Sequence, residues 1–237
     1  MSKIRTLLIG DFKQIFRDST LTTFLFIPVI VTLFVRYFVP YITLQYPVVE
    51  EYHVIIMMNA AIQTATMFGF IIAFISLDEK DENVLQVIRV LPISPYYFLT
   101  YRLLFAAVVS GFGAFLTISF GGIAYPGFLN SILIAIQFGL LAPILALLIT
   151  IYADNKVEGM AYFKGINLVL LLPILYFLLD FGFKNVLGTI PTYWSFRLYD
   201  LSMNQSHNFT FFLVGLAYYF LLIGILFFQF KKRVFER

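Results

Sequence analysis

Long runs of apolar residues, separated by short polar segments, dominate the pattern of this chain. A helix needs about 20 mostly apolar residues to cross the hydrocarbon core of a bilayer. Six runs reach this length, and each predicts one membrane-spanning helix. We therefore expect an all-α integral membrane protein in which residues 1–237 form a single transmembrane domain. The expected spans cover residues 21–41, 54–77, 98–123, 128–152, 165–183 and 209–230.

The segment before the first span, residues 1–20, has apolar positions at helical spacing. This spacing predicts an amphipathic helix lying at the membrane surface. A frayed leader with chance periodicity is the alternative interpretation. The apolar positions are Ile4, Leu7, Leu8, Phe12, Ile15 and Phe16, and the polar face holds Lys3, Arg5, Asp11, Lys13 and Arg17.

Composition narrows the class of protein further. Apolar residues make up 61% of the chain and charged residues 12%, against about 45–50% and about 25% in soluble proteins. A water-soluble protein of this length could not bury so much apolar surface, and a disordered chain would not contain it. Cys is absent, which excludes a small secreted scaffold held by disulfides.

The distribution of Lys and Arg predicts the orientation in the membrane. Thirteen of the 16 basic residues fall in the N-terminal segment, the loops after the second and fourth spans, and the C-terminal tail. Cytoplasmic loops carry such an excess of positive charge, so both termini are expected in the cytoplasm and the chain in the plasma (inner) membrane. The basic residues border apolar runs and form no separate basic face, so no nucleic-acid partner is expected.

The loop between the second and third spans predicts a short amphipathic helix that ends at Pro92. Four acidic residues stand at its N-terminal end, where the helix dipole favours anions. The helix is too short to span a membrane, so its apolar stripe needs either headgroups or another protein as a partner. The acidic residues disfavour anionic headgroups, and a protein groove is the better interpretation. The acidic residues are Asp78, Glu79, Asp81 and Glu82, and the stripe is Val84, Leu85, Val87, Ile88 and Leu91.

This loop resembles that of the permease subunits of ABC-2-type ATP-binding-cassette transporters. Those chains carry a charged cluster after their second span, then commonly a Gly, a Leu and, seven residues later, a Pro. Asn83 stands where Gly is usual, which is a mild departure because Asn tolerates unusual backbone angles. The six spans and the amphipathic leader extend the resemblance over the whole chain. The matching residues are Glu79, Lys80, Asp81, Glu82, Leu85, Pro92 and Ser94.

The resemblance implies that the loop helix is a coupling helix, which docks into a cleft of a separate ATP-hydrolysing subunit. It further implies a dimeric conduit, made with a second identical or similar permease chain, above two ATP-binding cassette subunits that hold ATP and Mg. This chain would bind no cofactor itself. Export of a drug or a lipid-like molecule suits a short chain without added domains. The implied coupling residues are Glu79, Asp81, Glu82, Val84, Leu85, Ile88, Leu91 and Pro92.

The sequence contains no motif of a nucleotide-binding, metal-binding or catalytic site. There is no G-x-x-x-x-G-K-[ST], no H-E-x-x-H and no C-x-x-C. A membrane enzyme would need converging ionisable groups within the spans, whereas Arg36 and Asp180 both lie near an outer end. The chain is therefore not expected to be an enzyme.

Three polar residues of the second span, Asn59, Gln63 and Thr66, share one helical face. Such a face avoids lipid, and it either lines the substrate conduit or forms hydrogen bonds between helices. Arg36 of the first span either has a transport role or extends to the outer headgroups beside Tyr37.

Other features concern packing and the outer surface. Small residues at helical spacing, among them Ala107 and Gly111, predict close helix packing in the third span. The aromatic segment 184–208 suits the headgroup layer, as an interfacial anchor would. It also resembles the short helices that ABC-2 permeases place after the fifth span, which partly re-enter the membrane. The alternative function is that of a six-helix membrane protein without ATP coupling, such as a secondary carrier or an immunity or structural protein.

Overall fold

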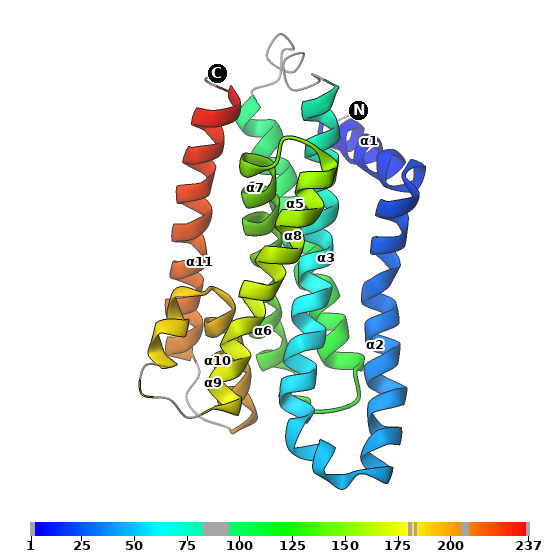
Figure 1. The fold of residues 1–237 in the computed structure, drawn as a ribbon, viewed down its shortest axis with the longest axis vertical. Helices are drawn as coiled ribbons and strands as arrows, with labels where there is room; N and C mark the ends of the chain where they lie inside the picture. Colours follow the sequence, from blue (N-terminus) through cyan, green and yellow to red (C-terminus); the bar gives the residue numbers. More distant parts are fainter. Residues whose placement is uncertain (1–2, 83–94, 180–181, 183, 205–208, 236–237) are drawn as a thin grey trace.

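The structure is a computed structural model that describes residues 3–82, 95–179, 182, 184–204 and 209–235. The described residues form a bundle of helices aligned along one axis (Figure 1), and none of them lies in a β-strand. Six segments are long and apolar enough to cross a membrane, which confirms the predicted all-α fold with six spans. The spans are α2 (Ser19–Gln45), α3 (His53–Asp81), α5 (Pro95–Phe120), α6 (Phe128–Gly139) with α7 (Leu141–Tyr152), α8 (Lys156–Leu171) and α11 (Phe209–Phe230).

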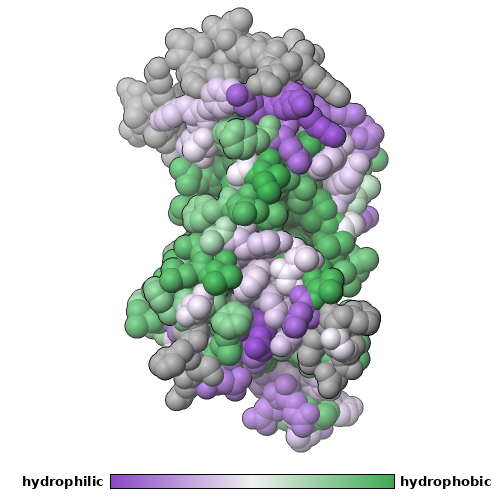
Figure 2. Space-filling model, turned by 90° about the vertical axis from the view of Figure 1, so that its left-hand side faces the viewer, coloured by the Kyte–Doolittle hydropathy of each residue, from purple (hydrophilic) through white to green (hydrophobic). Residues whose placement is uncertain are grey.

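The helix α3 forms the centre of the bundle. In the segment Pro47–Asp81, which adds the 3₁₀ turn η1 (Pro47–Tyr52) to α3, 89% of the apolar stretch is buried, against 17% in α2. The helix packs against α2, α5, α7 and α8. A helix that is apolar on all sides belongs inside a bundle, and α3 fits this rule. The peripheral helices leave a hydrophobic band on the outer surface between two more polar ends (Figure 2).

Close helix packing depends on small residues, as predicted for the third span. A Cβ added at Gly139 in α6 would lie 2.7 Å from the carbonyl oxygen of Ala107 in α5, and a Cβ at Gly111 would lie 3.2 Å from that of Ala135. Backbones can approach this closely only where a side chain is missing. The small residues of α5 therefore hold α5 and α6 together.

Two spans differ in their boundaries from the prediction. The fifth begins at Lys156 rather than near residue 165, because the side chain of Asn155 caps the helix by accepting the N–H of Glu158 at 3.0 Å. Its α-helix ends at Leu171, and Pro173 lies in the 3₁₀ turn η2 (Leu172–Ile174), which leads into α9 (Leu175–Leu178). The fourth span is interrupted at Leu140, three residues before Pro143, whose ring nitrogen cannot donate a hydrogen bond.

The segment between the fifth and sixth spans inserts into the bundle instead of lying on its surface. It consists of η3 (Lys184–Thr189) and α10 (Thr192–Met203), and Tyr199 of α10 is fully buried. The Tyr199 hydroxyl donates to the Ala124 carbonyl at 2.7 Å, and Ser195 pairs with Tyr219 of α11 at 2.8 Å. These contacts favour the interpretation that the segment partly re-enters the membrane.

The amphipathic helix α1 (Lys3–Arg17) lies across one end of the bundle, next to the end of α3 (Figure 1). The C-terminal end of α11, with its π-helical extension η4 (Lys231–Phe235), lies at the same end. We call this the terminal end. Ile15 is buried, whereas Phe16 is 61% exposed, as expected of a helix with one face on the bundle and another toward lipid headgroups.

Candidate functional site

The terminal end contains the two helix ends that flank residues 83–94, namely the end of α3 and the start of α5. Of the predicted coupling residues, Asp81 and Glu82 are exposed at the end of α3, whereas Glu79 is half-buried and turned into the bundle. The remaining predicted coupling residues lie outside the described part of the chain; they are Val84, Leu85, Ile88, Leu91 and Pro92.

The partner of Glu79 is Arg102, in the second turn of α5. The Arg102 side chain is 2% exposed and binds the Glu79 carboxylate through both terminal nitrogens, with Nη2 at 2.7 Å from Oε1. Nη2 also donates to Asp11 Oδ1 at 2.7 Å, which adds a carboxylate from α1. The guanidinium lies 4.4 Å from the centroid of the Phe98 ring, a favourable cation–π distance. One arginine therefore joins α1, α3 and α5.

Burial makes this cluster sensitive to the loss of any member. Charges out of water are tolerated only when paired, and removing one partner of a buried pair typically costs about 3–5 kcal/mol. The planar guanidinium can serve two carboxylates at once, whereas a lysine ammonium is a point charge that cannot form the same fork. We call Asp11, Glu79 and Arg102 the arginine cluster.

A second set of ion pairs lies beside the arginine cluster. Lys156, at the start of α8, binds Asp18 Oδ2 at 2.7 Å and Asp78 Oδ1 at 2.8 Å. Asp18 also caps α2 by accepting the backbone N–H of Thr20 at 2.8 Å. Burial would raise the pKa of Asp18, but the hydrogen bonds from Lys156 and the backbone amides outweigh it and bring the pKa below its ordinary value. Lys156 thus links α8 to the α1–α2 junction and to α3.

A third ion pair at this end is more exposed. Lys80 Nζ lies 2.8 Å from Asp154 Oδ1 and donates to the Ala153 carbonyl at 2.9 Å. The Asp154 side chain is 84% exposed. Solvent-exposed ion pairs contribute little to stability, so this pair differs in kind from the arginine cluster.

The polar face of the second span points toward α8. Asn59 and Gln63 are half-buried, whereas Thr66 is buried and its hydroxyl donates to the Gln63 carbonyl at 3.1 Å. Gln63 Oε1 accepts a hydrogen bond from Asn167 Nδ2 of α8 at 3.4 Å. Part of this face therefore forms hydrogen bonds between helices, and Asn59 and Gln63 remain the candidates for a conduit lining.

Arg36 is bound at the end opposite to the terminal end. Its Nη1 donates to the carbonyl of Phe120, the last residue of α5, at 2.8 Å, and its guanidinium lies 5.9 Å from the Tyr37 ring. A cation at the C-terminal end of a helix satisfies an unpaired carbonyl and opposes the helix dipole. This contact favours an anchoring role for Arg36.

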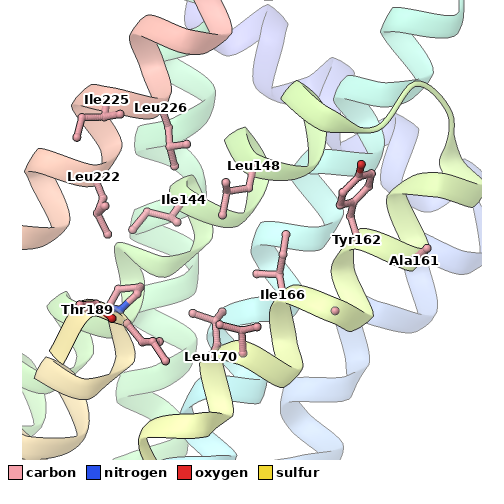
Figure 3. Close-up of a pocket in the computed structure, with 14 residues that line it drawn as sticks. Ile144, Leu148, Ala161, Tyr162, Ile166, Leu170, Thr189, Leu222, Ile225 and Leu226 are labelled. Carbon is pink, nitrogen blue, oxygen red and sulfur yellow. The ribbon is translucent and has the colours of Figure 1, made fainter. Parts of the chain in front are cut away.

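An apolar cavity of ≈ 630 Å³ lies between α7, α8 and α11, and residues 189–191 also line it (Figure 3). Its size falls within the range of small-ligand pockets, about 300–1,000 Å³. Aliphatic side chains such as Leu148, Ile166 and Leu222 line it. No predicted site residue contributes to this lining.

Several residues of these sites were not singled out by the sequence. The sequence indicates Asp11 only as part of a polar face, and Arg102 only as one of the thirteen basic residues that predict the orientation. Two signals were available: Asp11 is the one acidic residue on the otherwise basic polar face of residues 1–17, and Arg102 stands seven residues into an aromatic and apolar run that begins at Pro95. Asn167 had no comparable signal, because a lone amide in a span predicts no particular partner.

Comparisons with known proteins agree with this architecture. The model of the family described as "Fluoroquinolones export permease protein Rv2686c-like" matches residues 11–227. Two curated relatives, the fluoroquinolones export permease proteins MT2760 and Rv2686c, come from Mycobacterium tuberculosis strains CDC 1551 / Oshkosh and ATCC 25618 / H37Rv. Each is 26% identical over 232 residues, which cover 94% of this chain and 92% of the relative. No solved structure matches this chain.

The family match runs from α1 to the last turns of α11 and so includes all six spans. The chain is a multi-pass membrane protein and a transport subunit rather than an enzyme. It belongs to the family of fluoroquinolones export permease proteins of the Rv2686c-like type.

Proposed function

We propose that this chain is the membrane-spanning subunit of an ATP-driven exporter of the ABC-2 class. A separate ATP-binding cassette subunit, present in two copies, would hydrolyse ATP, and two permease chains would form the conduit. The relatives are named for fluoroquinolone export, and we extend a drug-like substrate to this chain. Its termini would lie in the cytoplasm, where the basic residues are expected.

The observation that carries this proposal is the arrangement at the terminal end. Glu79 and Arg102 join the end of α3 to the start of α5, the two helix ends that flank residues 83–94 in the sequence. A force applied to that loop would act on both helices together. Asp81 and Glu82 are exposed beside it, where they could face basic residues of a soluble partner.

A secondary carrier is the competing function, because the arginine cluster contains buried carboxylates. Carriers bind their substrates and coupling ions near the middle of the membrane, in broken helices. The arginine cluster instead lies at the terminal end, and its carboxylates are occupied by a guanidinium. This position favours a mechanical role over ion translocation.

The test is purification of the tagged chain from its native membrane in mild detergent, with identification of the bound proteins. We expect a soluble subunit with a P-loop to co-purify with the chain. In Leu85→Asp this subunit should no longer co-purify, although the variant chain still inserts into the membrane. Leu44→Asp is the matched control, because it introduces the same charge at an exposed leucine that lies at the end of the bundle opposite to the terminal end. Recovery of no ATP-binding subunit with the unaltered chain, or equal recovery with Leu85→Asp, would contradict the proposal.

A further inference from the structure

We propose that Arg102 is a positioning residue that makes α1 move with the ends of α3 and α5 during the transport cycle. The inference rests on the proposed function for the source of the motion, which is nucleotide binding to the partner subunit. Asp11 is the group on α1 through which the motion passes.

The first argument is the charge of the arginine cluster. Arg102 and Glu79 already form a neutral pair with two hydrogen bonds. Asp11 adds a second carboxylate, which is 5% exposed and gives the cluster one more negative than positive charge. A buried excess charge is unfavourable, so packing alone would be served as well by Asn. What the carboxylate supplies is a charge-assisted bond between α1 and α5.

The second argument is the manner in which α1 contacts the bundle. Beside Asp11, the ring of Phe12 packs edge-on against Phe105 of α5 at 5.9 Å, and Gln14 Nε2 donates to Asp78 Oδ2 of α3 at 3.3 Å. Both of these contacts also reach the end of α3 or the start of α5. In addition to its contact with α2, where the Thr22 hydroxyl donates to the Ile15 carbonyl at 2.8 Å, α1 thus contacts both helices that flank residues 83–94.

The third argument is continuity with α2. The α1 helix ends at Arg17, and Asp18 then caps α2. A displacement of α1 is therefore delivered directly to the first span. Through the arginine cluster, one movement at residues 83–94 would reach α2 as well as α3 and α5, although α2 is separated from that loop by a whole span in the sequence.

Asp11→Asn is the informative variant, because it breaks the charged link and leaves the neutral pair of Arg102 and Glu79 intact. The chain contains no Cys, so a single introduced cysteine can carry a spin label without background. Lys13→Cys places the label on the exposed side of α1, and Thr100→Cys places it on the exposed side of α5 near its start. Spectra are recorded in the complex with the ATP-binding subunit, reconstituted in lipid, with and without ATP trapped by vanadate.

We expect both labels to respond to nucleotide in the parent complex. In Asp11→Asn the label at position 100 should respond as in the parent, and the response at position 13 should be clearly reduced. Asp11→Glu, which keeps a carboxylate on α1, should retain the response at position 13. Asp154→Asn, which removes a carboxylate of the exposed pair at the same end, should leave both responses unchanged.

Other outcomes separate the two proposals. A response at position 13 that is undiminished in Asp11→Asn overturns the inference, because α1 then moves through other contacts. A response at position 100 without one at position 13 in the parent also overturns it and leaves the proposed function standing. No response at either position contradicts the proposed function and removes the basis of the inference.

Discussion

Asp11 and Arg102 are 91 positions apart in the sequence, yet Asp11 Oδ1 lies 2.7 Å from Arg102 Nη2 in a buried site. This contact fixes the amphipathic helix α1 to the third span. Because Glu79 of the second span binds the same guanidinium, the contact also places α1 beside both helix ends that flank residues 83–94. The site proposed for energy coupling therefore includes the N-terminal helix.

Replacement of Arg102 by Leu should destabilise the protein strongly. The variant leaves Glu79 and Asp11 buried without a cation, and such a loss typically costs about 3–5 kcal/mol. Arg36→Gln is the control, because Arg36 is exposed and the variant loses a single hydrogen bond, the one to the Phe120 carbonyl. Such a bond contributes about 1 kcal/mol. Thermal unfolding in detergent measures both, and equal losses would show that the arginine cluster is not buried as described.

Gly215→Ala should disturb the contact between the fourth and sixth spans. A Cβ at Gly215 in α11 would overlap Gln137 Nε2, which donates to the Phe212 carbonyl at 3.0 Å. The displaced amide would lose this bond inside the bundle, at a cost of about 1–3 kcal/mol. Gly224→Ala on the same helix meets nothing within 4 Å and should be neutral. Similar unfolding temperatures for both variants would contradict this packing.

Gln63→Leu should alter drug export more than Thr66→Val does. The amide of Gln63 is half-buried and its partner Asn167 lies at 3.4 Å, whereas the Thr66 hydroxyl is buried and bonds within its own helix. Loss of the Gln63–Asn167 bond should cost only about 0.6 kcal/mol, so a change in transport KM would report contact with the substrate. An unchanged KM in Gln63→Leu would contradict a conduit lining and show that Gln63 serves only the packing of the helices.

Asp18→Asn should make the free energy of unfolding less dependent on pH in the acidic range. The folded-state pKa of Asp18 lies below its ordinary value of 3.8, so its ionised form adds stability above the unfolded-state pKa, and this contribution is lost as the pH falls through the folded-state pKa. Asn still caps α2, which isolates the effect of the charge. Unfolding followed between pH 6 and about pH 3 tests this, and an unchanged pH dependence in the variant would show that Lys156 does not stabilise the carboxylate.

Local patterns were sufficient for the fold but not for the arginine cluster. Apolar runs fix where a span lies, and the sixth was predicted at residues 209–230, where α11 is found. The partners of a charged side chain depend on how distant helices meet, and no periodicity encodes the approach of Asp11 to Arg102. For the same reason the resemblance groups Glu79 with Asp81 as a coupling residue, whereas in the structure Glu79 turns inward and binds Arg102.

The segment between the fifth and sixth spans illustrates a similar limit. Its aromatic residues are typical of the headgroup layer, and composition alone could not distinguish a helix on the surface from one inside the bundle. The hydrogen bonds of Thr192 to the Leu170 carbonyl, at 2.6 Å, and of Tyr199 to the Ala124 carbonyl are what hold α10 in place. Both partners are backbone carbonyls, which any residue type provides and no sequence pattern reveals.

Transport into inside-out vesicles tests the central claim, ATP-driven export, most directly. The vesicles would contain the chain and its co-purified partner, and uptake of a fluoroquinolone would be measured with ATP alone and with a pH gradient alone. We expect uptake that requires ATP, that disappears in Leu85→Asp, and that a pH gradient cannot replace. Uptake driven by the pH gradient without ATP, and insensitive to Leu85→Asp, would contradict the account and identify a secondary carrier.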